Sequence, residues 1–281
     1  MTTPKPPKKA AEGPGPMHVI SLGAGVQSSA MALMAARGEI GPMPEAAIFA
    51  DTQAEPKEVY RWLSWLKKIL PFPVFTVTRG NLGKDACLVN KSKRGNNYTG
   101  HAVPAFIKDK QGRVGLAMRQ CTTDHKINVI YQKLSLIRKK RDVIQWVGIS
   151  FEERGRMKTA RRAWVKNRYP LVDMFITRAG CLEWMKKNGY PTPPRSACVF
   201  CPFHNDKEWE RLKTTDPKSF RSAVRFEKKY QAALHQVSGF RGTPFLHRSC
   251  VPLEQVDFRS SYEKFGQQNL WEDECEGMCG V

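Results

Sequence analysis

Apolar and polar positions follow a repeating order along the chain after residue 17. An apolar run at 18–22 leads into a Gly-rich turn, and small and apolar residues then recur at helical spacing over 26–37. The order repeats with an apolar run at 46–50, a helical pattern over about 56–69 and a third apolar run at 73–78. Strands that alternate with helices through short connections make right-handed crossovers, so the pattern predicts a parallel sheet with helices on both faces.

Beyond residue 79 the periodicity weakens, and polar residues dominate up to about residue 120. We interpret 79–120 as a long excursion that can serve as a lid over a site. A basic amphipathic segment at 124–140 leads to a further strand at 143–149, and helices are expected at 176–188, 206–213 and 217–237. The predicted fold class is therefore α/β, with a Rossmann-like parallel sheet and an irregular C-terminal region.

Composition divides the chain into three parts. Residues 1–16 are rich in Pro, Lys and Gly and are predicted to form a disordered leader. Residues 17–240 are predicted to form one α/β domain, which is within the size that a single core can reach. Residues 241–281 are expected to form an extension that carries cysteines.

Charge and hydropathy narrow the classes of partner. The formal net charge is +20, and 41% of the residues are hydrophobic. A positive excess of this size favours polyanions such as tRNA or DNA, although a basic enzyme for small phosphorylated substrates fits it too. The sequence shows neither an apolar run long enough to span a membrane nor a secretory leader, so we expect a cytoplasmic protein without a membrane partner.

The turn after the first strand has the composition of an anion cradle. Glycines let the backbone approach a phosphate, the amides at a helix start carry partial positive charge, and serine hydroxyls add donors. The turn differs from a Walker loop and from a dinucleotide-binding G-x-G-x-x-G motif. A tight turn that needs glycine only for its geometry is the alternative. The candidate nucleotide-binding residues here are Ser21, Gly23, Gly25, Gln27, Ser28 and Ser29.

The second predicted strand ends at Asp51 and Thr52. The carboxyl edge of an open parallel sheet is where ligands bind, and a carboxylate there can accept hydrogen bonds from ribose hydroxyls. The alternative is that the two residues only begin the turn and cap the helix that opens at Pro56.

The chain holds eight cysteines, and four of them suggest a metal or cluster site. Cys198 and Cys201 form a CxxC motif followed by proline, a sequence found beside zinc and iron–sulfur ligands. Cys121 is the third candidate ligand, and either Cys250 or His204 is the candidate for the fourth. Burial of the CxxC thiols as small apolar side chains is the alternative.

Cys275 and Cys279 lie close to the C-terminus. A thiol on a flexible tail can enter an active site, join a disulfide relay or carry a persulfide, and these two are the candidate catalytic residues. The alternative, which the sequence supports equally, is a disordered C-terminal end whose two thiols have no chemical role.

In this order the motifs resemble those of the phosphoadenosine phosphosulfate (PAPS) reductase and adenine nucleotide alpha hydrolase superfamily, whose members carry a PP-loop. The Ser-x-Gly turn is similar to the reductase form of that loop, and residues 49–60 are similar to the family segment after the second strand. Trp146 and Gly148, followed by Arg154 and Arg156, look like the family's "W..G.R" strand end, although Ser150 replaces an expected arginine. Residues 169–174 and Tyr190-Pro191 precede the CxxC motif as they do in the family.

Two departures bear on what the resemblance implies. Cluster-bearing reductases have a Cys-Cys pair where this chain has Gln120 and Cys121, which leaves three matched ligands, as in tRNA thiolation enzymes whose cluster keeps one iron open for sulfur. The end of the chain around Cys279 is similar to the reductase tail but lacks its histidine.

The resemblance thus implies an adenine nucleotide, ATP or PAPS, with Mg²⁺, and a 4Fe-4S cluster, with zinc as the alternative. The preferred activity is sulfur transfer to nucleic acid through an adenylated intermediate, which needs a sulfur donor. Reduction of PAPS or adenylyl sulfate to sulfite, with Cys279 as nucleophile and a thioredoxin-like reductant, is the alternative. A non-catalytic nucleic-acid-binding protein with structural zinc is a third. Gly148, Arg154, Arg156 and Lys126 are expected near the phosphates.

Overall fold

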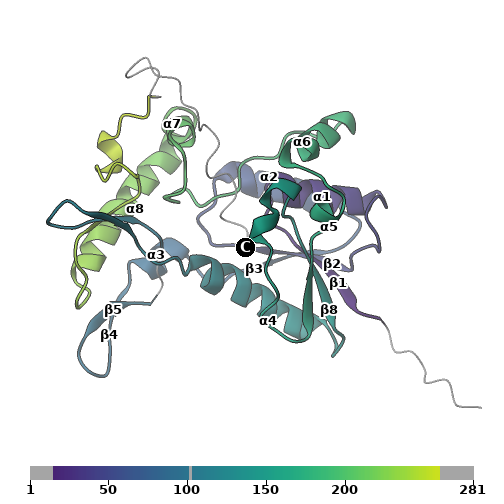
Figure 1. The fold of residues 1–281 in the computed structure, drawn as a ribbon, viewed down its shortest axis with the longest axis horizontal. Helices are drawn as coiled ribbons and strands as arrows, with labels where there is room; N and C mark the ends of the chain where they lie inside the picture. The colour runs from purple at the N-terminus through teal and green to yellow at the C-terminus, as the bar shows by residue number, and fades with distance from the viewer. Residues whose placement is uncertain (1–14, 101–102, 260–281) are drawn as a thin grey trace, which may run out of the picture.

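The structure is a computed structural model that describes residues 15–100 and 103–259. Its centre is a five-stranded sheet in the order β3-β2-β1-β8-β9, in which every neighbouring pair is parallel (Figure 1). The α/β class and the parallel sheet predicted from the sequence are confirmed. The strands are β1 Met17–Ser21, β2 Ala46–Ala50, β3 Val74–Val77, β8 Val143–Val147 and β9 Val165–Arg168.

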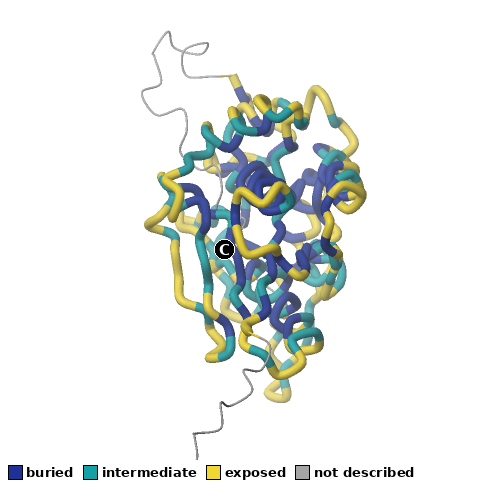
Figure 2. Tube along the Cα trace, turned by 90° about the vertical axis from the view of Figure 1, so that its right-hand side faces the viewer, coloured by how far each residue is buried: buried dark blue, intermediate teal, exposed yellow. Residues whose placement is uncertain are grey.

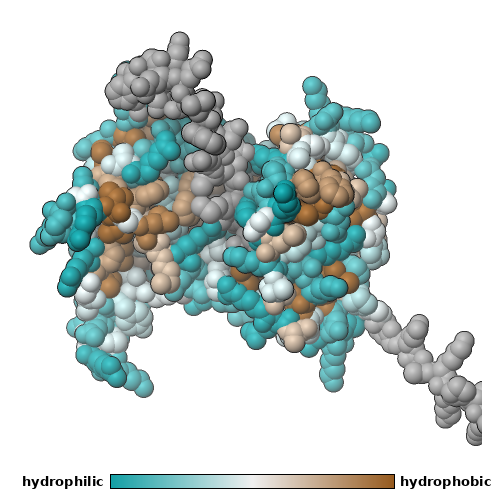
Figure 3. Space-filling model, viewed as in Figure 1, coloured by the Kyte–Doolittle hydropathy of each residue, from teal (hydrophilic) through white to brown (hydrophobic). Residues whose placement is uncertain are grey.

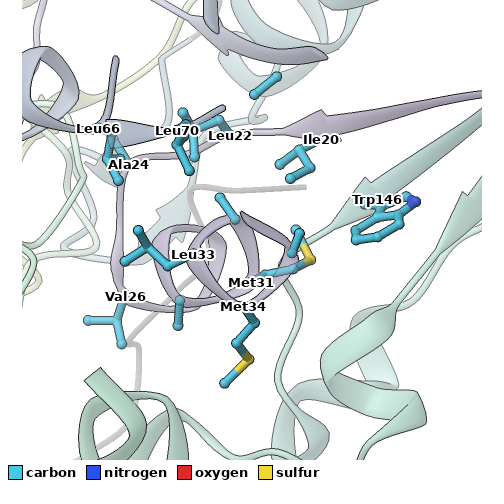
Figure 4. Close-up of a cluster of buried hydrophobic side chains, with 14 of the residues drawn as sticks. Ile20, Leu22, Ala24, Val26, Met31, Leu33, Met34, Leu66, Leu70 and Trp146 are labelled. Atoms are coloured by element: carbon cyan, nitrogen blue, oxygen red, sulfur yellow. The ribbon is translucent and has the colours of Figure 1, made fainter. Parts of the chain in front are cut away.

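Helices cover both faces of this sheet. One face packs on α1 Val26–Ala36, α2 Lys57–Ile69 and α6 Arg178–Lys187, with the short α5 Pro170–Asp173 beside them. Ile20 of β1 and Trp146 of β8 point to this face, toward Met31 of α1, whereas Met34 lies on the side of α1 away from the sheet (Figure 4). The opposite face packs on α4 Asn128–Ile137, with Val143 and Val165 against Ile130 and Leu134. The apolar alternation within each strand therefore fills two separate cores.

The excursion predicted at 79–120 is structured and belongs to a second lobe (Figure 1). It contains α3 Leu82–Ala86 and two hairpins, one of β4 Val89–Lys91 with β5 Asn97–Thr99 and one of β6 Phe106–Lys108 with β7 Val114–Leu116. This lobe also contains α7 Asp206–Thr215 and α8 Pro217–His235. Its core is a third cluster of buried residues around Trp209, Phe226 and Leu246. A packed lobe with its own core replaces the simple lid that weak periodicity suggested.

The described part of the predicted C-terminal extension, 241–259, is built into this second lobe. Its strand β10 Thr243–Phe245 pairs antiparallel with β6, and the 3-10 helix Leu253–Gln255 follows. The buried Glu227 carboxylate of α8 accepts hydrogen bonds from the Leu246 and Leu253 amides, at 2.8 Å each. The predicted boundary at residue 240 therefore falls inside a packed unit. Residues 1–14 of the predicted leader and 260–281 of the tail lie outside the described residues.

The segment predicted as a helix at 124–140 begins with a π-helix, Thr123–Ile127, that continues into α4. A 3-10 helix, Phe151–Arg156, follows β8. Buried residues concentrate in β1, β2, β8 and α1, whereas exposed residues lie in the surface hairpins and connections (Figure 2). Within the described ranges, none of the helices is long and apolar enough to cross a membrane.

The two hydrogen bonds to Glu227 predict a stability difference. Glu227→Ala leaves two buried amides without an acceptor, so we expect a loss of about 1–3 kcal/mol in the free energy of unfolding by urea denaturation. Glu254→Ala is the control, because its ion pair with Lys228 is exposed and such pairs contribute about 1 kcal/mol at most. Equal losses in the two variants would show that Glu227 does not anchor the C-terminal segment.

Candidate functional site

A cavity of about 370 Å³ opens at the carboxyl ends of the central strands. Pockets for cofactors and other small molecules start at about this size, and the carboxyl edge is where open parallel sheets bind ligands. The loop between β1 and α1, the ends of β2 and β8, and the start of α4 all contribute to its wall. Lining residues come from 21–28, 49–50, 119–131, 145–148, 153–167 and Ser196.

The Gly-rich loop is held in shape by one hydroxyl. Ser28 Oγ accepts a hydrogen bond from the Gly23 amide at 3.1 Å and donates one to the Gly25 carbonyl at 3.4 Å. Gly25 is the N-cap of α1, and no side chain among the described residues caps this helix start. Because the first-turn amides carry partial positive charge, a loop of this form can bind an anion in the cavity whose wall it makes.

Gly148 fixes the position of this loop against β8. A Cβ added at Gly148 would lie 2.8 Å from both the Cα and the backbone nitrogen of Ser28. Only a residue without a side chain lets the two backbones come this close. Gly148 therefore sets how far the loop stands from the sheet, as well as lining the cavity itself.

Positive charge dominates the cavity wall. Glu153, the acidic residue in the described lining, pairs with Arg156 and accepts a hydrogen bond from Gln27 Nε2 at 3.3 Å. The Gln27 amide is held from its other end by Arg178, whose Nη1 lies 3.4 Å from Gln27 Oε1. This charge balance suits a ligand with several negative charges. The lining cations are Arg119, Lys126, Arg156, Lys158 and Arg161.

A second, small cavity of about 30 Å³ brings three of the predicted thiols together. Cys121, Cys198 and Cys201 all line it, and Thr52 Oγ1 lies within hydrogen-bond distance of Cys198 Sγ, at 3.2 Å. The Cys201 amide donates to the Cys198 carbonyl at 2.9 Å, which closes the tight turn of the CxxC motif. Residue 121 thus lies beside the CxxC pair even though 76 residues separate it from Cys198.

The two cavities share part of their walls. Arg119, Thr122 and Lys126 line both of them. Lys126 Nζ lies 3.7 Å from Glu55 Oε1, and Glu55 Oε2 in turn accepts a hydrogen bond from Ser196 at 3.3 Å. A ligand in the large cavity and a group on the thiols would therefore be separated by a single layer of side chains.

The thiols do not form a site for a single ion. Among residues 15–100 and 103–259, no three Cys, His, Asp or Glu side chains are arranged to hold one metal ion. Cys250, a candidate fourth ligand, is buried after β10, where its amide donates to the His247 carbonyl, and it does not line the thiol cavity. The structure therefore gives no support for Cys250 as a ligand.

His204, the alternative fourth ligand, also serves another purpose. Its Nε2 lies 3.0 Å from the Cys198 carbonyl oxygen, and its ring meets Trp209 edge-on. Burial lowers the pKa of His204 to about 4, so the ring is neutral at physiological pH and packs as part of the core. Through its contact with the Cys198 carbonyl it stabilises the CxxC turn. It is not among the residues that line the thiol cavity.

Four of the residues predicted to bind a nucleotide do not line the large cavity. Ser29 is fully buried, and its Oγ accepts a hydrogen bond from the Trp62 indole at 2.9 Å. Asp51 Oδ1 accepts from Tyr60 at 2.8 Å and from the Gln53 amide, which ties the end of β2 to α2, although no side chain among the described residues caps the start of that helix. Arg154 is exposed over the Phe151 ring. Thr52 lies at the thiol cavity.

The other predicted site residues either line the large cavity or lie outside the described residues. The large cavity is lined by Ser21, Gly23, Gly25, Gln27, Ser28, Gly148, Arg156 and Lys126, as the sequence suggested. Cys275 and Cys279 lie outside the described residues. The sequence analysis missed Arg119, Thr122, Gln145 and Asn167. Of these, only Gln145 had a signal, because it is a polar residue between apolar neighbours in a strand predicted to be buried.

Neighbouring serines with different contacts predict opposite defects. Ser28→Ala removes the hydroxyl that shapes the loop, so we expect the Kd for ATP, measured by calorimetry, to rise about fivefold with little change in stability. Ser29→Ala leaves a buried indole N–H without its acceptor, so we expect a loss of about 1–3 kcal/mol in stability with unchanged ATP affinity. Weaker ATP binding in Ser29→Ala alone would reverse the assignment of the two residues.

The close contact between the Gly-rich loop and the end of β8 predicts that a methyl group added at Gly148 weakens both stability and ATP binding. Gly148→Ala places a Cβ against Ser28, and we expect about 1–3 kcal/mol of destabilisation together with at least tenfold weaker ATP binding. Gly155→Ala is the matched control, because a Cβ there meets nothing within 4 Å. Melting temperature and ATP affinity would both be measured. Unchanged binding in Gly148→Ala would show that the loop position does not control the site.

Comparisons with known proteins found similarity among solved structures. The search of family models and the search of curated proteins each found no match. Among solved structures, the chain is similar to the phosphoadenylyl-sulfate (PAPS) reductase from Candida auris, solved as a phosphate complex. The sequences are 10% identical, the match covers 63% of this chain and 75% of that chain, and the TM-score is 0.37.

Proposed function

We propose that this chain is a nucleotide-dependent sulfurtransferase that acts on nucleic acid. ATP in the large cavity adenylates an oxygen on a base: the base oxygen attacks the α-phosphorus, and the bond from that phosphorus to the bridging oxygen of pyrophosphate breaks. Sulfide from a sulfide donor then attacks the base carbon that bears the adenylated oxygen. AMP leaves with the original oxygen, and the base carries sulfur in its place.

The shared wall of the two cavities carries this proposal. Arg119, Thr122 and Lys126 face the cationic cavity on one side and the thiols on the other. Activation of an oxygen and its replacement by sulfur take place at one carbon, so the two halves of the reaction need adjacent binding sites. Nucleotide hydrolysis alone would not account for the thiols, and a structural metal site alone would not account for the cationic cavity beside them.

The chain's own residues supply the electrostatics of the first half. Negative charge builds up on the leaving pyrophosphate, and Lys126, Arg156 and Arg161 line the cavity where they can stabilise it. The amides of the Gly23–Gly25 segment and the start of α1 bind phosphate oxygens without adding bulk. Glu153 next to these groups is a candidate Mg²⁺ ligand, since a carboxylate facing phosphates is tolerated when a cation lies between them.

The thiol set suits a cluster better than zinc. Three cysteines on one small cavity offer soft ligands of the type that iron–sulfur clusters use, and a cluster holds its ligands farther apart than one ion does. When bound, such a cluster would supply an iron that can carry sulfur. Cys121, Cys198 and Cys201 would hold it, and the Thr52 hydroxyl would hydrogen-bond to the Cys198 sulfur.

The surface charge supports nucleic acid as the acceptor. The net charge of +20 exceeds what one nucleotide needs. Lys91, Lys93 and Arg94 are exposed on the β4–β5 hairpin, where Tyr98 is 46% exposed and can stack on a base. This hairpin extends from the second lobe, and its surface is hydrophilic in Figure 3.

Product analysis tests the proposal. With ATP, a sulfide donor and tRNA or DNA, we expect AMP and pyrophosphate in equal amounts, formed only when nucleic acid is present. We also expect iron and acid-labile sulfide in anaerobically purified protein, lost in Cys198→Ala and retained in Cys250→Ala. Formation of sulfite from PAPS with a dithiol reductant, and no AMP from ATP, would overturn the proposal in favour of a reductase.

A further inference from the structure

Two carboxamides form one part of the wall of the large cavity. Gln145 of β8 and Asn167 of β9 are register partners in the parallel sheet, and both line the cavity. Paired residues of neighbouring strands project from the same face, here the face that α4 covers, as their neighbours Val143 and Val165 do. The two amide groups therefore stand side by side at the cavity, at a position where the rest of the strand pattern calls for apolar residues.

The orientation of the Asn167 amide is fixed by its neighbours. Asn167 Nδ2 donates to the Lys158 carbonyl at 2.8 Å and lies 3.3 Å from the Tyr169 hydroxyl. Exchanging the nitrogen and oxygen would put two oxygens together, so the carbonyl end must be Oδ1. Asn167 Oδ1 is buried and has no hydrogen-bond partner among the described residues.

Gln145 can present a second acceptor, because no hydrogen bond among the described residues fixes which end of its amide faces the cavity. The residue is 9% exposed, and its Oε1 is also buried without a partner in the described part of the chain. A buried carbonyl that lacks a donor costs free energy, and native proteins satisfy nearly all such groups. Two of them, side by side on a cavity wall, indicate a ligand that brings two N–H donors to one place.

We propose that Gln145 and Asn167 accept hydrogen bonds from the exocyclic amino group of the adenine base, which makes them the residues that select adenine. This inference rests on the proposed nucleotide-dependent function. An amino group on a ring carbon carries two hydrogens, one for each acceptor, whereas a hydroxyl carries one. A keto oxygen at the same ring position, as in guanine or hypoxanthine, would face two carbonyl oxygens and be repelled.

The rest of the cavity fits a purine. Ile127, Ile130 and Tyr131 line it from the π-helix and α4, beside the two carboxamides, and offer apolar surface for a flat ring. The Tyr131 hydroxyl accepts a hydrogen bond from the Arg161 amide at 3.2 Å, which holds the 158–161 connection over this part of the cavity. The base would lie against α4, with its phosphates toward the Gly-rich loop.

Matched nucleotides test the assignment. ATP and inosine triphosphate differ only in the ring edge on which an amino group is replaced by a keto oxygen, so we expect the wild-type chain to bind ATP at least tenfold more tightly in calorimetry. Gln145→Met removes one acceptor at similar volume and should reduce this preference to about threefold or less. Gln145→Glu retains acceptor oxygens and should keep the preference.

Inorganic tripolyphosphate distinguishes failure of the base-selecting role from failure of the nucleotide site itself. It should bind wild type and Gln145→Met equally, because it lacks a base. Equal affinity of wild type for ATP and inosine triphosphate, with tripolyphosphate bound, would overturn the base-selecting role alone. An unchanged preference in Gln145→Met would also overturn it. Failure of ATP, inosine triphosphate and tripolyphosphate to bind wild type would overturn the nucleotide site itself, and this inference with it.

Discussion

The site depends on the contact between two backbones, that of Ser28 at the start of α1 and that of Gly148 at the end of β8. Their separation leaves no room for a Cβ at residue 148. Because β1 and β8 are paired along their whole length, the contact transmits the geometry of the sheet to the Gly-rich loop. The loop is then held on its other side by Ser28 Oγ, so its amides have one fixed arrangement before any ligand arrives. Preorganisation of this kind is what makes amides effective at binding anions.

Docking of the second lobe brings sulfur next to that loop. The Val199 amide donates to the Ala54 carbonyl at 2.8 Å, and Ser196 lies against Gly25, where an added Cβ would meet it at 3.6 Å. These contacts place the CxxC turn beside the connection from β2 to α2. Glu55 then links Ser196 to Lys126, which lies between the two cavities. The lobes are therefore joined at the functional site itself, and sequence segments more than 140 residues apart complete it.

Adjacent residues of one motif can have unrelated tasks, which limits what a motif predicts. Ser28 and Ser29 look equivalent in the sequence, yet a helix turns by about 100° per residue, so one reaches the cavity and the other the Trp62 indole in the core. Asp51 shows the same limit. Its position at the carboxyl end of β2 is correct for a ligand contact, but Tyr60 and the Gln53 amide engage its carboxylate.

The sequence by itself determined the alternation of strands and helices, the position of the Gly-rich loop and the CxxC pair, because these follow from local periodicity, glycine geometry and spacing. Only the tertiary structure decided that 79–120 forms part of a second core, that Cys250 lies apart, and that Gln145 and Asn167 share a wall. Each of these depends on pairing between distant segments, such as β6 with β10 or β8 with β9. Local propensity carries no information about register between strands that are far apart in the chain.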